Sequence, residues 1–425
     1  MTQLLIGSDY QMTEKPENAE LIIVNTCGFI DTAKTESLQL LSELAGEKRP
    51  DQYLIATGCL TQRYGNEVAN KIPGIDGILG TRRWMDIVEV VDKLRGKKHP
   101  LPIYHIPDTL DVGRDDAGVM RYSIQGKSAY IKIADGCRRP CAFCAIPLIK
   151  GTTVSRPAES ILQEAQTLQE IGIHEIILIA QDTTDYGHDL GIKNGLANLL
   201  RQLVQAVPEV DWIRVMYAYP GYVTDELIDV MASHSQILSY LDMPLQHAHP
   251  AVLKRMRRPA NTNWVYRTLD KIRLKMPDIA LRTTFIVGFP GETEEEFQTL
   301  LDFIKDIQFD KVGAFQYSYE EGTPAESLGD PVPAQIKQER WARLMELQQR
   351  ISLERNQELV GSTLDVLIEG SGDGISLGRS YRDAPEIDGL VIIESADPIG
   401  EMVPVRITGA MAYDLTGIVV QPNSN

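Results

Sequence analysis

The chain has 425 residues, 43% of them apolar, and its 42 Lys and Arg against 59 Asp and Glu give a net charge of 42 − 59 = −17. This length exceeds what one hydrophobic core supports, so we expect two or three domains, and the acidic balance disfavours broad, backbone-driven RNA binding and favours a basic protein partner. Five cysteines argue against a secreted disulfide framework and predict a cytoplasmic protein, and no stretch is long and apolar enough to predict a membrane span.

Residues 1–97 alternate between apolar runs, which are typical of buried parallel strands, and stretches with helical periodicity. The predicted strands are 21–27, 53–59 and 74–80, and the predicted helices begin at Asp31 or Thr32, at Thr61 and at Trp84. Alternation of this kind predicts an α/β domain with a doubly wound parallel sheet.

Cys27 and Cys59 occupy the same place in this pattern, at the carboxyl end of the first and second predicted strands. Open α/β sheets gather their ligands at this edge, and neighbouring parallel strands would bring the two sulfurs onto one rim. Because free cysteine is commonly buried, two small residues filling strand ends remain the alternative. Two thiolates alone do not complete an iron–sulfur site, which uses three or four.

A stretch rich in proline and charge, 98–122, is predicted to be a linker with some extended structure around 103–106. Residues 123–356 then form a longer α/β series that ends in a polar helix at about 333–359. Its predicted strands are 129–134, 175–181, 212–219, 240–245, 280–288 and 312–317, and its predicted helices include 158–169, 196–205, 224–231 and one that a capping box opens at Thr293. Six units are too few for an eight-stranded barrel, so we expect a partial (β/α)6 TIM-like barrel.

The tail, 357–425, holds short β-rich runs at 363–368, 390–393, 403–407 and 415–420, separated by turns rich in Gly and Asp, and predicts a small β-barrel or sandwich. It contains three Arg, no Lys and eleven Asp or Glu, so its net charge is 3 − 11 = −8. Small barrels often bind oligonucleotides, and this charge has the wrong sign for that partner.

Three cysteines lie within eight residues just after the strand predicted at 129–134, as Cys137, Cys141 and Cys144 in a C-x3-C-x2-C spacing. On one tight loop, three sulfurs can face a common centre. A structural zinc site would want a fourth ligand, and the local sequence supplies none. Three thiolates on a four-iron cluster leave one iron open to bind a substrate. Three unconnected core cysteines are the alternative, which the clustering disfavours.

This loop resembles the cluster loop of radical S-adenosylmethionine (SAM) enzymes, and the chain as a whole resembles their iron–sulfur subgroup, the methylthiotransferases. Residues 24–30 and 57–60 are similar to the amino-terminal cluster domain of that family, 135–147 to its radical SAM loop, and the tail to its TRAM domain. Within the family, the stretches 180–184, 217–220, 243–247 and 379–389 are most similar to members that act on a small-subunit ribosomal protein.

The resemblance implies two [4Fe–4S] clusters and SAM as cofactors. The three loop cysteines would hold the cluster that cleaves SAM, with Phe143 shielding it or packing near the adenine. Gly288 and Gly291 end a predicted strand and would let the backbone approach the nucleoside closely. A turn before the next helix is the equal alternative for these glycines. No catalytic acid or base is assigned.

The second implied cluster belongs to the amino-terminal domain, where the family carries three cluster cysteines. Cys27 and Cys59 match two of them. The family's first strand, with the Gly-Cys motif that carries the other, has no counterpart in this sequence, which begins Met1-Thr2-Gln3-Leu4-Leu5. The simplest hypothesis is that this sequence starts downstream of that motif, and genuine loss of the ligand, which would cripple the second cluster, is the alternative.

The activity that the resemblance implies is addition of a methylthio group to the β-carbon of an aspartate in the twelfth small-subunit ribosomal protein. Its implied partners are that protein or the ribosomal subunit, a low-potential electron donor such as flavodoxin or ferredoxin, and a sulfur donor. The first alternative is a tRNA adenosine methylthiotransferase, which the acidic tail disfavours. The second is a catalytically silent iron–sulfur scaffold or sensor, suggested by the missing cysteine.

Other polar residues are weaker candidates. Gln181 and Asp182 follow a predicted strand, although Asp182 also suits a turn. His247 is as well explained as a structural histidine as it is as a proton shuttle. The basic run 254–258 fits a solvated helix end better than a contact to SAM or to a partner.

Overall fold

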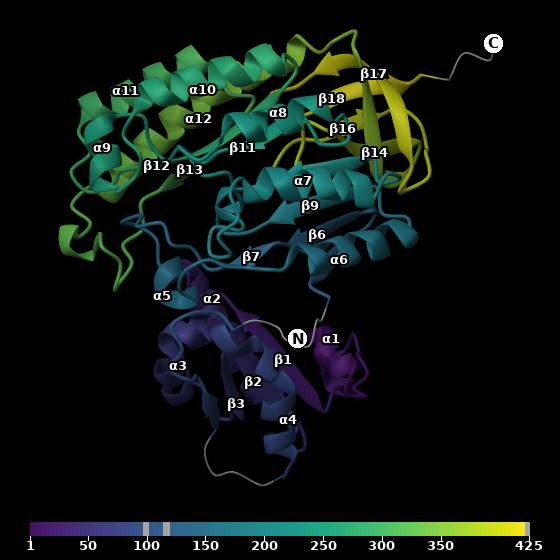
Figure 1. The fold of residues 1–425 in the computed structure, drawn as a ribbon. Helices are drawn as coiled ribbons and strands as arrows, with labels where there is room; N and C mark the ends of the chain where they lie inside the picture. Colours follow the sequence, from purple (N-terminus) through teal and green to yellow (C-terminus); the bar gives the residue numbers. More distant parts are fainter. Residues whose placement is uncertain (97–101, 114–119, 421–425) are drawn as a thin grey trace. The chain divides into compact units, whose positions relative to one another are not determined.

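The structure, a computed structural model, describes residues 1–96, 102–113 and 120–420 (Figure 1). Two compact units make up the chain. The first comprises 1–120, 135–154 and 318–327, and the second comprises 121–134, 155–317 and 328–425. In the described ranges, no helix is both long enough and apolar enough to cross a membrane.

The predicted linker is only partly visible, because 98–101 and 114–119 lie outside the described residues. The extended structure expected near 103–106 is confirmed by strand β4 (Ile103–His105). The domain boundaries at 97, 122 and 356 stay predictions.

The first unit contains a parallel sheet in the order β1-β2-β3-β4. Its other strands are β1 (Leu21–Thr26), β2 (Tyr53–Gly58) and β3 (Gly77–Gly80), and its helices are α1 (Thr2–Ile6), α2 (Asp31–Glu47), α3 (Cys59–Lys71), α4 (Ile87–Gly96) and α5 (Ile146–Lys150). Alternate side chains of β2 enter different clusters: Leu54 packs with α2 and α3, whereas Ile55 packs with α1 and α4. Helices therefore cover both faces, as expected for a doubly wound sheet. Helix α2 has Ile30 at its N-cap and no capping side chain, so the expected cap from Asp31 or Thr32 is wrong.

The second unit contains six parallel strands, which confirms the predicted partial barrel. They are β6 (Ser128–Lys132), β9 (Glu175–Ile179), β10 (Trp212–Val215), β11 (Tyr240–Asp242), β12 (Ala280–Val287) and β13 (Lys311–Gln316). An isolated bridge between Ile213 and Ile237 links the sheet β10-β9-β6-β5 to the sheet β11-β12-β13. The antiparallel strand β5 (Tyr122–Gln125) was not predicted.

Helices follow the barrel strands along the chain (Figure 1). Most of them bury apolar residues in the core that they share with the strands. They are α6 (Ala158–Glu170), α7 (Gly195–Ala206), α8 (Asp225–Ser233), α9 (Pro250–Arg255), α10 (Thr262–Lys275), α11 (Glu294–Ile307) and α12 (Ala334–Gln357). In β12, alternate residues Leu281, Phe285 and Val287 pack in this helix-facing core. The remaining short elements are η1 (Pro16–Asn18), η2 (Thr81–Asp86), β7 (Ala134–Asp135), β8 (Val154–Ser155), η3 (Thr183–Asp185) and η4 (Glu326–Leu328).

The tail forms the predicted small β-barrel, closed in the order β14-β15-β16-β18-β17. Its strands are β14 (Thr363–Gly372), β15 (Ile375–Ser380), β16 (Val391–Ile393), β17 (Met402–Ala410) and β18 (Leu415–Val419). Strand β15 was not predicted, because its buried alternate residues are Ser376, Gly378 and Ser380, which give no apolar period.

Buried charges join this small barrel to the amino ends of the partial-barrel strands. Glu175, the first residue of β9, is fully buried, and its carboxylate lies 2.6 Å from Arg214 of β10 and 2.6 Å from Arg379 of β15. Ser128, the first residue of β6, donates to the same carboxylate at 2.8 Å. Burial alone would raise the pKa of Glu175, but the two guanidinium groups outweigh it and lower the pKa to about 2.

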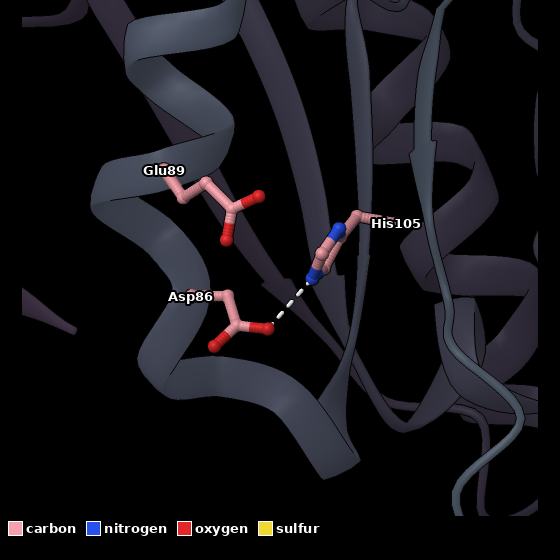
Figure 2. Close-up of side chains that lie close together, drawn as sticks. All are labelled: Asp86, Glu89 and His105. Carbon is pink, nitrogen blue, oxygen red and sulfur yellow. Dashed lines mark hydrogen bonds and ion pairs between the residues drawn. The ribbon is translucent and has the colours of Figure 1, made fainter.

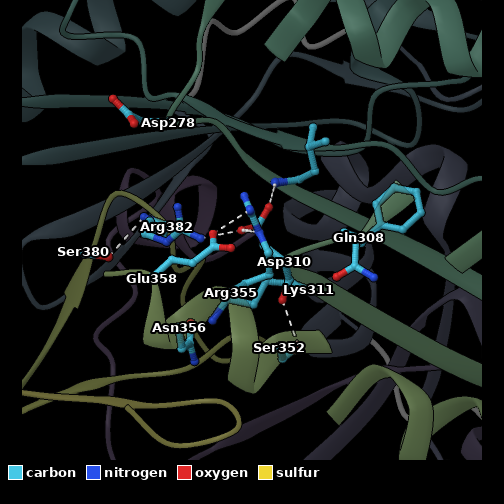
Figure 3. Close-up of polar contacts among 12 residues, drawn as sticks. Asp278, Gln308, Asp310, Lys311, Ser352, Arg355, Asn356, Glu358, Ser380 and Arg382 are labelled. Carbon is cyan, nitrogen blue, oxygen red and sulfur yellow. Dashed lines mark hydrogen bonds and ion pairs between the residues drawn. The ribbon is translucent and has the colours of Figure 1, made fainter. Parts of the chain in front are cut away.

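A second set of paired charges surrounds Asp310, just before β13 (Figure 3). Its Oδ1 atom lies 2.5 Å from Arg382, which follows β15, and 3.4 Å from Arg355 of α12. The neighbouring Lys311 places its Nζ atom 2.8 Å from Asp383. Two adjacent residues at the start of β13 therefore bind the segment that follows β15, and the small barrel is fixed to the core by its charges.

Replacing Arg379 with Met should strongly destabilise the second unit, because Glu175 keeps only one cationic partner in a fully buried place. We expect the free energy of unfolding, measured with urea, to fall by about 3–5 kcal/mol. Arg406→Met is the matched control, since Arg406 is exposed on β17 of the same barrel, and it should change stability by less than about 0.5 kcal/mol. Similar losses in the two variants would contradict this account of the interface.

The stabilisation from Glu175 should depend on pH. Its pKa is lowered from 4.5 in the unfolded chain to about 2, so the stabilisation is fully present above pH 4.5 and is lost as the pH falls towards 2. A shift of this size corresponds to about 3 kcal/mol. We expect wild-type protein to lose more unfolding free energy than Glu175→Gln between pH 6 and pH 3. Parallel stability curves for the two proteins would refute the assignment.

Candidate functional site

The three clustered cysteines lie on the loop between β7 and α5, in the first unit. Cys137 and Cys141 are buried, each with 8% of its surface exposed, and Cys144 is half-buried. The loop is fixed by its own backbone, since the N–H of Cys137 donates to the carbonyl of Gly151 at 3.1 Å and that of Cys144 to Cys141 at 3.2 Å. Three thiols are thus held on a short, ordered and largely buried segment.

A glycine is required where the chain enters this loop. Gly136 has a φ of 74°, and a Cβ atom there would lie 1.9 Å from the carbonyl oxygen of Thr152. Lys150 of α5 pairs with Asp135 at 2.9 Å and so joins the two ends of the loop. The Gly136 turn and the Lys150–Asp135 ion pair therefore help to hold the three cysteines in place.

The donor set fits an iron–sulfur cluster. The loop supplies three thiols within eight residues, two of them buried. A structural zinc site has four ligands, whereas three thiolates on a [4Fe–4S] cluster leave one iron open. Phe143 is half-buried within the loop, and its predicted role beside a cofactor stays a prediction.

The sheet register places Cys27 and Cys59 at one edge, as predicted. Thr26 and Gly58 are register partners at the carboxyl ends of β1 and β2, and each cysteine is the next residue. The backbone segments that follow β1 and β2 stay close together, because a Cβ atom on Gly28 would lie 2.6 Å from the Cα of Leu60. Cys27 is exposed and Cys59 half-buried. Their role as metal ligands stays a prediction.

Gly288 and Gly291 lie in the second unit, in the turn that joins β12 to α11. Both have left-handed backbones, with φ of 72° and 75°. A Cβ atom on Gly288 would lie 2.4 Å from Cγ of Lys337, whereas the atom nearest to a Cβ on Gly291 would be Nε of Arg255 at 3.7 Å. The turn itself therefore explains why glycine is needed, and contact with a nucleoside stays a prediction.

Glu292 organises this turn. Its buried carboxylate accepts the N–H of Gly288, which lies 3.1 Å from each oxygen, and pairs with Arg340 of α12 at 2.8 Å. Arg340 also donates to the backbone carbonyl of Glu292 at 3.1 Å. Nε2 of the fully buried His247 faces the carboxylate at 3.5 Å. Burial lowers the pKa of His247, an effect that Glu292 opposes, so the imidazole suits a structural role.

The predicted basic run is not a uniformly solvated helix end. Arg255 donates to the carbonyl of Gly291 at 3.2 Å and pairs with Glu296 at 2.6 Å. Arg258 is buried, stacks over the ring of Tyr219 at 4.2 Å, and donates to a backbone carbonyl. The other two cations of the run, Lys254 and Arg257, are exposed. Glu296 also completes the predicted capping box with Thr293.

The two candidates after β9 differ. Asp182 accepts from the hydroxyl of Thr184 at 2.5 Å at the start of η3, which favours the turn interpretation. Gln181 has a buried amide oxygen with no hydrogen-bond partner among the described residues. Neither residue lies in a set of groups that identifies a catalytic acid or base.

Sequence reasoning gave no role to Glu292, Arg340 or Lys337. A signal was present in α12, where charged residues at 337 and 340 lie in helical register with the apolar Leu344 and Ile351. Charged residues that share a helix face with buried apolar residues are themselves expected to be buried, and they then need partners of opposite charge. For Glu292, the spacing of four residues after Gly288 allows a side chain to reach back to the turn's own backbone.

One other group has the composition of a metal site (Figure 2). Asp86 and Glu89 on one helical segment face His105 of β4, whose Nε2 lies 2.7 Å from Asp86. Arg83 already holds Asp86 with bonds of 2.9 and 2.8 Å, and Glu89 pairs with Lys93. Because cations occupy both carboxylates, this group is an ion-pair cluster and not a cation site.

Three family models match the chain. The Radical SAM superfamily model matches residues 131–304, the TRAM domain model matches 360–420, and the model of Uncharacterized protein family UPF0004 matches 1–80. Their order along the chain is that of the predicted α/β domain, partial barrel and small β-barrel, and the predicted fold class is confirmed.

Solved structures with the same fold include the radical S-adenosylmethionine methyltransferase TsrM from Kitasatospora setae. Its form with cobalamin and a [4Fe-4S] cluster bound aligns with a TM-score of 0.54 at 16% identity, over 86% of this chain and 70% of that one. The form with tryptophan substrate and a SAM analogue aligns with a TM-score of 0.56 at 14% identity, over 91% and 71%. At this identity the likeness is one of fold.

Curated relatives cover nearly the whole chain. The ribosomal protein uS12 methylthiotransferase RimO of Chloroflexus aurantiacus is 50% identical over 98% of this chain and 95% of its own length. RimO of Symbiobacterium thermophilum is 45% identical over 99% of this chain and 88% of its own length. The suspected resemblance is confirmed, and the chain belongs to the RimO family of radical SAM methylthiotransferases.

Proposed function

We propose that this chain adds a methylthio group to the β-carbon of an aspartate in ribosomal protein uS12. The observation that carries the proposal is the ordered loop of Cys137, Cys141 and Cys144, two of them buried and one half-buried. Identity of 42–50% to relatives named for this activity, over nearly the whole chain, supports the same conclusion.

The three loop cysteines would bind a [4Fe–4S] cluster as thiolates. When bound, such a cluster, together with SAM, supplies reductive cleavage of a sulfonium and so a carbon radical that abstracts hydrogen from an unactivated carbon. The chain's own contribution is to fix the ligands, through the Gly136 turn and the Lys150–Asp135 pair, and to keep Cys137 and Cys141 from solvent. In this proposal, Phe143 packs beside the cofactors.

The turn of Gly288 and Gly291 is our candidate for SAM contact in the second unit. It lies at the carboxyl end of β12, which is where TIM-type barrels bind their ligands. Glu292 and Arg255 fix its backbone from opposite ends through bonds to Gly288 and Gly291. Backbone groups held in this way would contact a nucleoside without rearranging on binding.

Cys27 and Cys59 are proposed as ligands of a second cluster. Their adjacent positions at the ends of β1 and β2 support this role. The five cysteines of this sequence leave no further thiolate once the loop has taken three. The second cluster therefore needs a ligand from outside these five, and its sulfur would come from a separate donor. A low-potential flavodoxin or ferredoxin is the proposed source of electrons.

The acidic charge supports a basic protein as the substrate. The tail has a net charge of 3 − 11 = −8, and the whole chain 42 − 59 = −17. Nucleic acid carries a dense negative charge, and its binding depends on Lys and Arg that neutralise phosphates. A tRNA substrate is therefore the weaker candidate. A silent iron–sulfur scaffold is the other alternative, and the family's chemistry disfavours it.

Replacing Cys141 with Ser should abolish formation of 5′-deoxyadenosine from SAM under reducing, anaerobic conditions, because the cluster loses one of three ligands. We expect the iron content of the protein to fall by the amount that this one cluster contributes. Cys59→Ser is the matched control and should keep SAM cleavage while losing methylthio transfer. Deoxyadenosine from the Cys141 variant would exclude the loop as the cluster site, and tightly bound zinc in place of iron would do the same.

The substrate assignment can be decided by mass spectrometry. Reconstituted protein, incubated with SAM, a reductant and sulfide, should add the mass of a methylthio group to one aspartate of uS12 and none to tRNA. Modification of tRNA with no change in uS12 would select the alternative. SAM cleavage without modification of either would leave the radical chemistry in place and refute the substrate.

A further inference from the structure

Helix α12 has a mostly polar sequence, yet one of its faces is buried. The residues on that face are Lys337, Arg340, Leu344, Gln348, Ile351, Ser352 and Asn356. Their spacing of three or four residues places them in one stripe along the helix. Each polar member bonds to a neighbour, so the stripe consists of directed contacts as well as packing.

The amino-terminal end of this stripe reaches the turn that follows β12. Arg340 bonds to both the carboxylate and the backbone carbonyl of Glu292, at 2.8 and 3.1 Å. Lys337 packs against Gly288 and donates to the carbonyl of Tyr317 at 2.9 Å. Both cations are buried, with 5% and 6% of their surfaces exposed. The helix therefore fixes the turn at two points.

Further along, the stripe fixes the helix itself. Gln348 donates to the carbonyl of Phe309 at 2.8 Å. Ser352 donates to the carbonyl of Asp310 at 3.0 Å (Figure 3). At the carboxyl end, Asn356 donates to the carbonyl of Met411 in the small barrel at 3.0 Å. These bonds prevent the helix from sliding or rotating, and so they determine where Arg340 stands.

The turn needs such support because of its glycines. Gly288 and Gly291 adopt left-handed conformations at little cost, but glycine also has many other conformations of similar energy. The bond from the Gly288 N–H to Glu292 selects one of them. Glu292 is buried, with 5% of its surface exposed, so the position of its carboxylate depends on the Arg340 guanidinium that faces it.

We infer that Glu292 and Arg340 are positioning residues for cofactor binding. Arg340 holds the Glu292 carboxylate, and the carboxylate holds the Gly288 amide, so that the turn is preorganised for SAM. The inference rests on the proposed function, because it takes SAM as the ligand of this turn. Neither side chain needs to touch SAM, and neither takes part in its cleavage.

The test compares Arg340→Gln, Arg340→Lys and Glu292→Gln with the control Arg343→Gln. Arg343 lies one turn further along α12, is one-third exposed, and pairs with the exposed Glu294 at 2.6 Å. Hydrogen exchange of the Gly288 amide is measured in protein without cofactors. The dissociation constant of SAM, iron content and the rate of SAM cleavage at saturating SAM are measured after anaerobic reconstitution.

For Arg340→Gln and Glu292→Gln we expect faster exchange at Gly288 and a dissociation constant for SAM raised by at least about tenfold. Arg340→Lys should lie between these variants and wild type. Iron content should stay unchanged, because the cysteine loop belongs to the other unit, and the rate at saturating SAM should change by less than about threefold. The control should match wild type throughout.

Wild-type affinity for SAM in the folded variants would overturn the inference, as would an equal loss of affinity in Arg343→Gln. Should Arg340→Gln fail to fold, Glu292→Gln and Arg340→Lys decide the question by the same measurements. Absence of SAM binding by the wild-type protein would overturn the proposed function and this inference with it. If the wild-type protein binds SAM and the variants bind it with the same affinity, the inference is overturned and the proposed function is not.

Discussion

Buried carboxylates hold the second unit together, because each has lost its hydration and a facing cation compensates for that loss. Glu175 is matched by two guanidinium groups at the amino ends of the barrel strands. Asp310 is matched by Arg382 and Arg355 at the start of β13. Glu292 is matched by Arg340 at the opposite end of β12. Removing one cation would leave Glu175 or Asp310 with a single cationic partner, and would leave Glu292 without its paired arginine.

These ion pairs have different roles at the two ends of the partial barrel. At the amino ends, they bind the small barrel through β15 and the segment that follows it, and they contact no proposed ligand. At the carboxyl end, the same kind of pair fixes a glycine turn where ligand binding is proposed. Rigidity there matters because backbone groups bind a ligand well only when their orientation is set beforehand. The cysteine loop in the first unit is held by backbone hydrogen bonds and by the Lys150–Asp135 ion pair.

The strands and helices of the barrel were predictable from the sequence, because their apolar residues recur with the period of each element. Strand β15 was not, since small and polar residues fill its inner face. The cysteine loop was predictable from its spacing alone. The ion pairs were not, because Arg379 and Glu175 are 204 residues apart and only the fold brings them together. Arg340 and Glu292 were missed for the same reason, although charges in register with Leu344 gave a local hint.

Helix α12 touches the small barrel through a side-chain amide that bonds to main-chain carbonyls, at Met411 and Ala412. This contact does not depend on which side chains those two positions carry. The side chains at these two positions can therefore change without disturbing this contact to the helix. A chimera that exchanges the small β-barrel should keep a folded partial barrel if it retains residues 379–388. In this range, Arg379, Arg382 and Asp383 pair with Glu175, Asp310 and Lys311 at the amino ends of the partial-barrel strands.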